Sequence, residues 1–280
     1  MAKPTAQMAS PSYRLAVEDP DFLLRDEVRA LRFAMEYGKA ELLLRDWGIR
    51  STVVVFGSAR VPSPEQAQAL QRRAKSGGAK TSAMKTLDLV HWYEEARRFG
   101  RLVSEQGGAL HDKAAGRDNV IATGGGPGIM EAANRGATEA GAPSIGFNIT
   151  LPAEQQPNAY STPDLTFRFH YFAMRKMHLA LRANALAVFP GGFGTMDELF
   201  EVLTLQQTHK APKMPVVLFN RAFWKSVINF EALVEYGTIN ADDLHLFDIV
   251  DTAEDAWSAM LRRGLVAHSG ESKPKVPGSV

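Results

Sequence analysis

Three apolar runs in the sequence each lead directly into glycine: residues 52–56 into Gly57-Ser58, residues 120–123 into Gly124-Gly125-Gly126-Pro127-Gly128, and residues 185–189 into Pro190-Gly191-Gly192-Phe193-Gly194. The runs are continuously apolar and do not alternate with polar residues. Such runs are typical of strands buried on both faces, as in parallel sheets covered by helices. This feature constrains the fold more than any other in the chain.

Segments with helical periodicity alternate with the apolar runs along the chain. We predict strands at 52–58, 120–123, 144–149, 165–170, 185–189, 216–219 and 248–250. Helices are predicted at 20–47, 86–106, 129–140, 172–182, 195–208, 222–236 and 253–263. Alternating strands and helices imply right-handed crossovers, and therefore a mostly parallel sheet with helices on both faces.

The predicted fold class is therefore α/β: one doubly wound, Rossmann-like domain over residues 18–268 with extra N- and C-terminal helices. Residues 61–85 are polar and are interpreted as an insertion within this domain. Residues 1–17 and 269–280 contain proline or glycine and show no periodicity. We expect them to be a flexible arm and a flexible tail.

The predicted N-terminal helix starts at Asp19-Pro20, which suit the N-cap and the first helical position. It ends near Gly48. Apolar residues fall on one face at spacings of three and four, namely Leu24, Val28, Leu31, Met35 and Leu42. We favour packing of this face on its own domain, and a dimer seam is the alternative.

Composition excludes several classes of function. The 280 residues carry a net charge of +1, which gives no reason to expect binding to nucleic acid or to an anionic membrane. There is no cysteine, so disulfides, thiolate metal sites and a thiol nucleophile are excluded. The first ten residues lack the apolar stretch of a secretory signal, and no run is long enough to cross a bilayer. We expect a soluble, cytoplasmic protein.

The glycine clusters at 124–128 and 191–194 are the candidate ligand-binding loops. Glycines allow close approach of a ligand, and the start of the next helix presents free N–H groups, a combination that suits phosphate. The alternative is that the glycines serve only tight turns. Ile129 and Asp197 stand where the dinucleotide fingerprint has its third glycine, and no Gly-Lys-Ser/Thr follows either cluster.

Polar and charged residues beside these loops indicate which kind of ligand the loops could bind. Thr195 can add a hydroxyl to a phosphate site, whereas Asp197 and Glu198 fall in the first predicted helical turn. Their carboxylates either complement the helix dipole, with Glu198 forming a capping box with Thr195, or lie near the ribose of a nucleotide. Arg175-Lys176 begin another helix, where cations oppose the dipole. They indicate either an anionic partner or a solvated basic pair.

The remaining candidates carry weaker signals. Ser58 is a possible polar contact, but no Gly-x-Ser-x-Gly elbow surrounds it. The seven histidines show no metal-ligand spacing and are interpreted as structural or surface residues. We expect Met130, Met174 and Met177 to fill the core.

The motif Pro190-Gly191-Gly192-Phe193-Gly194-Thr195-Met196-Asp197-Glu198 resembles the PGGxGTxxE motif of the Lonely Guy (LOG) family. These proteins are cytokinin riboside 5′-monophosphate phosphoribohydrolases and are often labelled lysine decarboxylases. Residues 124–130 resemble the family's GGGxxGxM loop, and residues 170–176 resemble its Arg-Lys helix start. The resemblance covers roughly residues 50–235, with the motifs in the family order.

The resemblance implies cleavage of the N-glycosidic bond of AMP or an N6-substituted AMP to free base and ribose 5-phosphate, with no metal or other cofactor. It implies that Arg175 and Glu198 are catalytic. The substrate-binding positions implied with them are Lys176, Gly191, Gly192, Phe193, Gly194, Thr195, Met196, Asp197, Thr204, Gly125 and Gly126. Family members usually dimerise, so we expect a homodimer or a larger homo-oligomer.

Two other hypotheses compete with this enzyme. A non-catalytic nucleotide-binding or carrier protein would use the same fold, because fold does not determine function. A pyridoxal-phosphate lysine decarboxylase would need a Schiff-base lysine, for which Lys176 is the candidate in the motif region.

Overall fold

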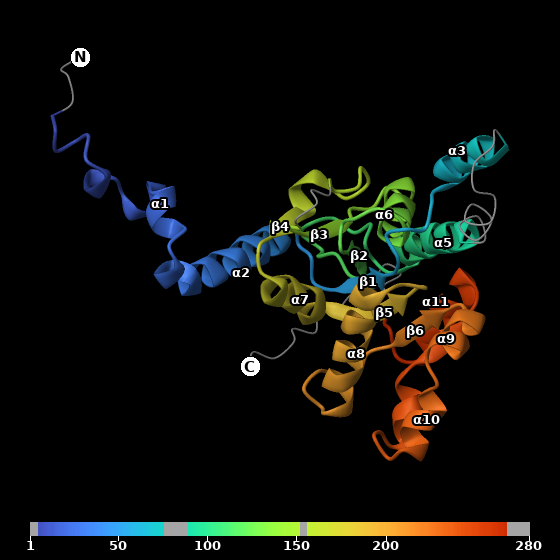
Figure 1. The fold of residues 1–280 in the computed structure, drawn as a ribbon. Helices are drawn as coiled ribbons and strands as arrows, with labels where there is room; N and C mark the ends of the chain where they lie inside the picture. The colour runs from blue at the N-terminus through green and yellow to red at the C-terminus, as the bar shows by residue number, and fades with distance from the viewer. Residues whose placement is uncertain (1–4, 76–88, 152–155, 268–280) are drawn as a thin grey trace.

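The computed structural model describes residues 5–75, 89–151 and 156–267. Their core is a seven-stranded parallel sheet with the strand order β4-β3-β2-β1-β5-β6-β7 (Figure 1). The strands are β1 Thr52–Phe56, β2 Val120–Thr123, β3 Ile145–Ile149, β4 Thr166–Phe169, β5 Ala183–Val188, β6 Val216–Phe219 and β7 Asp248–Val250. The predicted doubly wound α/β fold is confirmed.

The strand order creates a switch point next to the central strand. From β1 the chain builds outward through β2, β3 and β4, and then returns to the other side of β1 with β5. In sheets of this kind, ligands bind beyond the carboxyl ends of the strands at such a switch. The glycine turns that follow β2, β1 and β5 therefore share one edge of the sheet.

Helices cover both faces of the sheet. One face packs against α2 (Arg29–Asp46), α7 (Phe172–Leu181) and α8 (Phe193–Gln207), and the other packs against α5 (Val90–Gln106), α6 (Ile129–Glu139) and α11 (Ala253–Arg262). Alternate residues of β1 point to opposite faces of the sheet. Val54 and Phe56 pack in the hydrophobic core on the α2, α7 and α8 side, and Val53 and Val55 pack in the core on the α5, α6 and α11 side. Among the described residues, no helix combines the length and the apolar character that crossing a membrane needs.

Two predicted helices are divided in the structure. The predicted helix 222–236 consists of α9 (Arg221–Val227) and α10 (Phe230–Glu235). Ile228 is extended, and the Asn229 side chain accepts a hydrogen bond from the Ala232 N–H at 3.0 Å, which caps the second helix. A 3₁₀ helix, η5 (Ala241–Leu246), follows and was not predicted.

The predicted helix 20–47 is also wrong as a single element. Asp19 does cap α1 (Pro20–Leu23), because its carboxylate accepts from the N–H groups of Asp21 and Phe22 at 3.1 and 3.2 Å. The chain then breaks through η3 (Asp26–Val28) before α2 begins. Arg32 holds this break, since its Nη1 donates to the carbonyls of Leu23 and Arg25 at 2.7 and 2.6 Å. These carbonyls would accept from main-chain N–H groups in a continuous helix.

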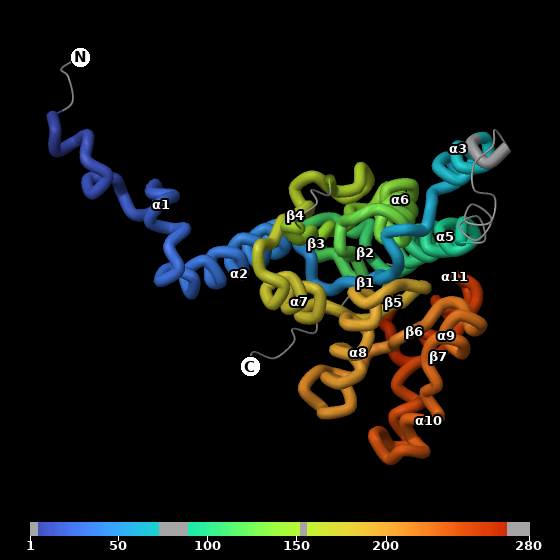
Figure 2. The backbone as a smooth tube through the Cα atoms, viewed as in Figure 1, coloured from blue at the N-terminus to red at the C-terminus, as the bar shows by residue number. Residues whose placement is uncertain are grey.

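The apolar stripe of this segment does not pack on its own domain. Leu24, Leu31, Met35 and Leu42 are 71%, 57%, 51% and 49% exposed, and Val28 alone among the five is buried. The preferred interpretation from the sequence is therefore wrong. Ahead of α1, η1 (Pro11–Tyr13) and η2 (Ala16–Glu18) contain no buried residue, and the tube view shows this segment extending away from the sheet and its helices (Figure 2).

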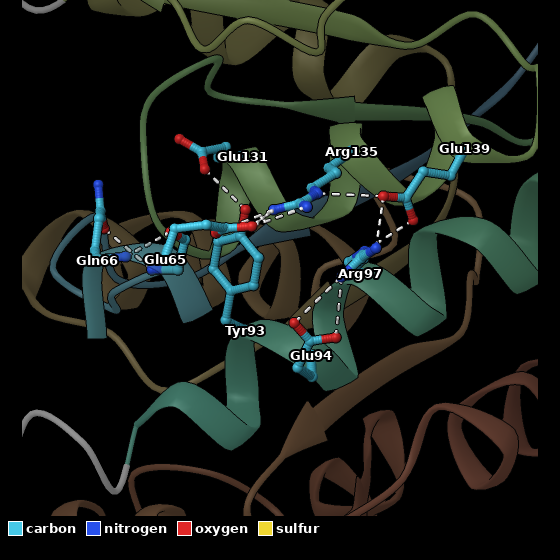
Figure 3. A network of polar contacts seen from close by, with 9 residues as sticks. Glu65, Gln66, Tyr93, Glu94, Arg97, Glu131, Arg135 and Glu139 are labelled. Atoms are coloured by element: carbon cyan, nitrogen blue, oxygen red, sulfur yellow. Dashed lines mark hydrogen bonds and ion pairs between the residues drawn. The ribbon is translucent and has the colours of Figure 1, made fainter. Parts of the chain in front are cut away.

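The predicted insertion contains a helix, α3 (Pro64–Lys75), and its residues 76–85 lie outside the described part of the chain, as do residues 86–88 and 268–280. A network of polar contacts fastens α3 to the body (Figure 3). Arg135 of α6 pairs with Glu65 of α3 at 3.1 Å and with Glu139 at 3.2 Å, and Glu139 also pairs with Arg97 of α5 at 2.7 Å. The insertion is thus tied to α5 and α6.

Candidate active site

The first glycine loop joins β2 to α6. Gly125 and Gly128 have positive φ values of 70° and 73°, which favour glycine. A Cβ at Gly125 would lie 2.1 Å from Asn148 Oδ1, and one at Gly128 would lie 2.3 Å from the Ser58 carbonyl oxygen. At these two positions the glycines serve the turn itself, as the alternative interpretation proposed.

Gly124 has a different role in the same loop. A Cβ at this position would lie 2.5 Å from Nη2 of Arg175 and 2.9 Å from Sδ of Met130. The absence of a side chain thus makes room for the Arg175 guanidinium. This glycine connects the first loop with the predicted catalytic arginine.

The second glycine loop joins β5 to α8. Gly191 faces Thr195, because a Cβ there would lie 2.1 Å from Thr195 Oγ1. A Cβ at Gly192 or Gly194 would meet nothing within 4 Å, so no neighbouring protein atom requires glycine there. Gly192 is the N-cap of α8, whose first N–H groups have no acceptor within the helix. The loop therefore gives an anion open access to these donors.

Arg175 of α7 and Glu198 of α8 meet at this edge of the sheet. Arg175 Nη1 lies 3.5 Å from Glu198 Oε1, and the two side chains are 12% and 7% exposed. The Arg175 Nε–H donates to the Phe147 carbonyl at 2.8 Å, which fixes the guanidinium between β3 and the first glycine loop. The structure thus brings together the two residues predicted to be catalytic.

Burial dominates the electrostatics of this pair. It raises the pKa of Glu198 to about 7, although the positive charges of Arg175 and Lys176 oppose the shift. Burial also lowers the pKa of Arg175, against the attraction of Glu198 and Asp197. At 3.5 Å the contact is too long to offset the burial of the carboxylate. Glu198 therefore exchanges a proton near neutral pH, as a general acid or base requires.

Lys176 is partly buried and forms ion pairs with two acidic residues of its own chain. Its Nζ lies 2.8 Å from Asp197 Oδ2 and 3.0 Å from Glu201 Oε2. The interpretation as a solvated basic pair is therefore wrong, because carboxylates of α8 pair with these cations. An anionic partner at this position stays a prediction. The predicted capping box is also wrong: α8 begins at Phe193, so Thr195 does not cap it and Glu198 lies in the second turn.

Ser58 lies where the two glycine loops meet. Its N–H donates to the Pro190 carbonyl at 3.0 Å, and its carbonyl accepts from the Ile129 N–H at 3.2 Å. Its hydroxyl accepts from the Arg60 N–H at 3.1 Å. The main chain of Ser58 thus holds the two loops in place beside each other.

The remaining predicted positions differ in their exposure to solvent. Thr204 is exposed and follows Phe193 by about three turns of α8, so one chain does not bring it to the loops. Phe193 is 96% exposed. Met130 and Met174 are partly buried, but Met177 is 40% exposed, so its prediction as a core residue is wrong.

Asparagines behind the first loop were missed in the sequence. Asn158 Nδ2 donates to the Gly126 carbonyl and to Asn134 Oδ1 at 3.1 and 3.0 Å, and its N–H donates to the Gly125 carbonyl at 2.9 Å. Asn134 Oδ1 also accepts from the Thr123 hydroxyl at 2.7 Å. This buried network fixes the loop from outside the glycine motif. No spacing in the sequence indicates it, because its members come from separate elements.

Lys176 does not suit a pyridoxal-phosphate enzyme. Burial lowers its pKa, but the hydrogen bonds that its ammonium group donates to Asp197 and Glu201 outweigh burial and raise the pKa above its ordinary value. A Schiff-base lysine must react as a neutral amine. Lys176, paired with two carboxylates, therefore does not suit the role of a Schiff-base lysine.

Comparison with known proteins finds similarity to one family over part of the chain. The model of the family described as "possible lysine decarboxylase" matches residues 130–260, which contain Arg175, the second glycine loop and Glu198. A cytokinin riboside 5′-monophosphate phosphoribohydrolase, LOG1 of Arabidopsis thaliana, is 34% identical over 83 residues, or 29% of this chain and 38% of that protein. Over this region the chain is similar to the Lonely Guy family.

A second Lonely Guy relative extends the match. The probable cytokinin riboside 5′-monophosphate phosphoribohydrolase LOG4 of Oryza sativa subsp. japonica is 27% identical over 139 residues, which are 48% of this chain and 59% of that protein. The matches thus span about two fifths and three fifths of these curated relatives.

Solved structures show more distant likeness. A molybdenum cofactor binding protein from Rippkaea orientalis has a TM-score of 0.43 at 20% identity, covering 61% of this chain and 86% of that one. The Moco carrier protein of Chlamydomonas reinhardtii has a TM-score of 0.46 at 19% identity, covering 76% and 97%. Likeness at this level supports no conclusion about function.

Proposed function

We propose that this protein hydrolyses the N-glycosidic bond of a nucleoside 5′-monophosphate, AMP or an N6-substituted AMP, to free base and ribose 5-phosphate. The observation that carries the proposal is the buried Arg175–Glu198 pair beside the two glycine loops. The names of the Lonely Guy relatives, which describe such phosphoribohydrolases, support it.

The second glycine loop suits the 5′-phosphate. Gly192 and Gly194 leave the start of α8 open, and its N–H groups and dipole favour an anion. Phosphate binding at a distance from the reacting carbon supplies energy for orienting the ribose. A nucleoside without phosphate should therefore be a poor substrate.

Glu198 is suited to act at C1′ of the ribose, the carbon at which the N-glycosidic bond breaks. Cleavage of an N-glycosidic bond passes through an oxocarbenium-like state, which a nearby carboxylate stabilises. In its ionised form Glu198 takes a proton from water as the water oxygen bonds to C1′ and the bond from C1′ to the base nitrogen breaks. The departing base takes up a proton from solvent water, and Glu198 returns its proton to solvent, so the net reaction consumes one water and yields free base and ribose 5-phosphate.

Arg175 suits a supporting role beside this carboxylate. Its guanidinium is held by the Phe147 carbonyl and lies against Gly124, so its position is fixed before substrate binds. Its charge favours the ionised form of Glu198. The same charge can hold the phosphate or support the departing base.

The proposal is tested by incubating the protein separately with AMP, N6-isopentenyl-AMP, adenosine and other nucleoside monophosphates, and separating the products. We expect free base and ribose 5-phosphate from AMP or its N6-substituted form, and at least tenfold slower release from adenosine. Tight nucleotide binding without product would favour the carrier hypothesis. Release from adenosine at the same rate would contradict the role of the second loop.

A further inference from the structure

Helix α7 begins without a cap of its own. The side chain of its N-cap residue, Tyr171, accepts no hydrogen bond from the helix, and the first turn contains no acidic residue. Arg175 and Lys176 lie close to this end, where positive charges oppose the helix dipole. The end of α7 that brings Arg175 to Glu198 is therefore unfavourable by its own sequence, so contacts from outside the helix are needed to hold it.

Glu36 of α2, which lies beside α7 (Figure 1), provides such a contact. Its Oε1 accepts from the His170 N–H at 2.8 Å, and its Oε2 accepts from the Tyr171 N–H at 3.3 Å. Hydrogen bonds from backbone N–H groups to a carboxylate are charge-assisted, and a negative charge at this end of a helix also complements the dipole. Glu36 thus places a carboxylate where the sequence of α7 has none.

The Tyr171 side chain is held by α2 as well. Phe33 meets its ring edge-on, with centroids 4.3 Å apart, and the Arg32 Nε–H donates to its hydroxyl at 3.0 Å. Such an aromatic pair contributes about 0.5–1.5 kcal/mol beyond the area that it buries. The same Arg32 holds the break that precedes α2. One stretch of α2 therefore fixes both the main chain and the side chain of Tyr171.

Tyr171 connects this contact with the candidate active site. Its carbonyl accepts from the Arg175 N–H at 3.2 Å, a hydrogen bond of the first turn of α7. Beyond this turn, the Arg175 guanidinium reaches the Phe147 carbonyl and Glu198. The backbone of Arg175 is thus held from α2, and its side chain from β3. A misplacement of about 1 Å at a catalytic group can cost roughly 100-fold in rate, so the backbone contact matters for the chemistry.

We propose that Glu36 is a positioning residue for Arg175, because it fixes Tyr171 and with it the first turn of α7. The inference rests on the proposed function, in which Arg175 supports Glu198 during base release. Glu36 acts through Tyr171 and not on the substrate. Helix α2, which precedes the first strand of the sheet, is in this way part of the machinery that sets the site.

The first test compares kcat for AMP in two variants of α2. Glu36→Ala should lower kcat by about tenfold, because Arg175 is no longer held in place. Glu36→Gln should restore part of this loss, since the amide oxygen can accept one of the two hydrogen bonds. Urea unfolding of each variant shows whether kcat refers to folded protein. An unchanged kcat in Glu36→Ala would overturn the proposal.

Glu41→Ala is the matched control. Glu41 lies on the same helix, and its carboxylate accepts from Arg182 at the opposite end of α7, at 2.6 and 2.7 Å. Its removal should lower the urea midpoint, as that of Glu36 should, but should leave kcat within about twofold of wild type. Equal losses of kcat in Glu36→Ala and Glu41→Ala would show that α2 only stabilises the fold, and would overturn the proposal.

A double-mutant cycle tests whether Glu36 acts through Arg175. In the Arg175→Met background, Glu36→Ala should change kcat by less than about twofold, because the side chain that Glu36 positions is already gone. A loss as large as the one measured with Arg175 present would mean that Glu36 acts by another route. That result would contradict the positioning role.

A last comparison needs no catalysis. The charge of Arg175 favours the ionised form of Glu198, so displacing Arg175 should make the ionised carboxylate more costly. At pH 8, Glu198→Gln should therefore raise the urea midpoint more in the Glu36→Ala background than in the wild-type background. Equal rises would overturn the proposal. If the wild-type protein released no base, the proposed function would fail, and this comparison would still decide whether Glu36 positions Arg175.

Discussion

At the residue scale, the surroundings of Glu198 set its affinity for a proton. The carboxyl group is buried, and Arg175 contacts it only at 3.5 Å. Burial therefore outweighs attraction, and the pKa rises to about 7. This value makes both the proposed activity and the stability of the protein depend on pH near neutrality.

The proposed activity should rise with pH through about 7, because Glu198 must be ionised to accept a proton from water. Arg175→Met removes a positive charge that lowers the pKa of Glu198, so the rising limb should move to higher pH. The measurement is kcat/KM for base release between pH 5 and 9. Arg168→Met, at an exposed arginine of β4, is the control and should leave the limb in place. If Arg175→Met left the pH at which kcat/KM rises unchanged, the electrostatic coupling between Arg175 and Glu198 would be contradicted.

The stability should fall with pH over the same range. The folded protein holds the Glu198 proton with a pKa of about 7, against an ordinary value of 4.5, so stability is lost as pH rises between these values. The ionised side chain costs on the order of 3 kcal/mol. Glu198→Gln should therefore be more stable than wild type at pH 8 by up to that amount and nearly equal at pH 4.5, as measured by urea unfolding.

Glu201→Gln is the matched control for stability. Glu201 follows Glu198 on α8 but is paired with Lys176 at 3.0 Å, so its removal should not stabilise the protein at pH 8. If Glu198→Gln gave the same stability difference at both pH values, the raised pKa would be contradicted.

At the element scale, the two glycine loops differ in what their glycines do. Gly124 makes room for the Arg175 guanidinium, and Gly194 borders open space at the start of α8. The sequence pattern, which treats the loops as equivalent, does not distinguish these roles. The difference between the roles of Gly124 and Gly194 lies in the atoms that a Cβ at each position would approach.

Alanine at these two glycines should affect different kinetic constants. Gly124→Ala should displace the guanidinium and lower kcat at least tenfold, because its Cβ would lie 2.5 Å from Arg175 Nη2. Gly194→Ala should mainly raise KM for the monophosphate by crowding the approach to α8, with little change in folding. Steady-state kinetics on AMP separate these effects. A normal kcat for Gly124→Ala would contradict the contact between this loop and Arg175.

The elements themselves were predictable to different degrees. The central strands and α5 to α8 follow from apolar runs and helical periodicity, which burial in a covered parallel sheet requires. The break before α2 depends on Arg32 bonding to the Leu23 and Arg25 carbonyls, which periodicity does not indicate. The cap at Asn229 is a local signal that could have divided the predicted helix 222–236.

At the scale of the whole molecule, the sheet brings the candidate site together. Strands β2, β1 and β5 are neighbours, so their glycine turns meet at one edge although they are far apart in sequence. Parallel strands make this meeting predictable from the sequence. The contact between Arg175 and Glu198, and the asparagine network behind Gly125, depend on how α7, α8 and the loops pack, which the residue pattern does not specify.

The most direct test of the account measures AMP turnover and AMP binding for wild type and Glu198→Gln under the same conditions. We expect base release to fall at least 100-fold while calorimetry shows an affinity for AMP within a few fold of wild type, because glutamine cannot accept the proton from water. Unchanged turnover in this variant would contradict the assignment of the reaction to the pocket shared by Arg175, Glu198 and the two glycine loops.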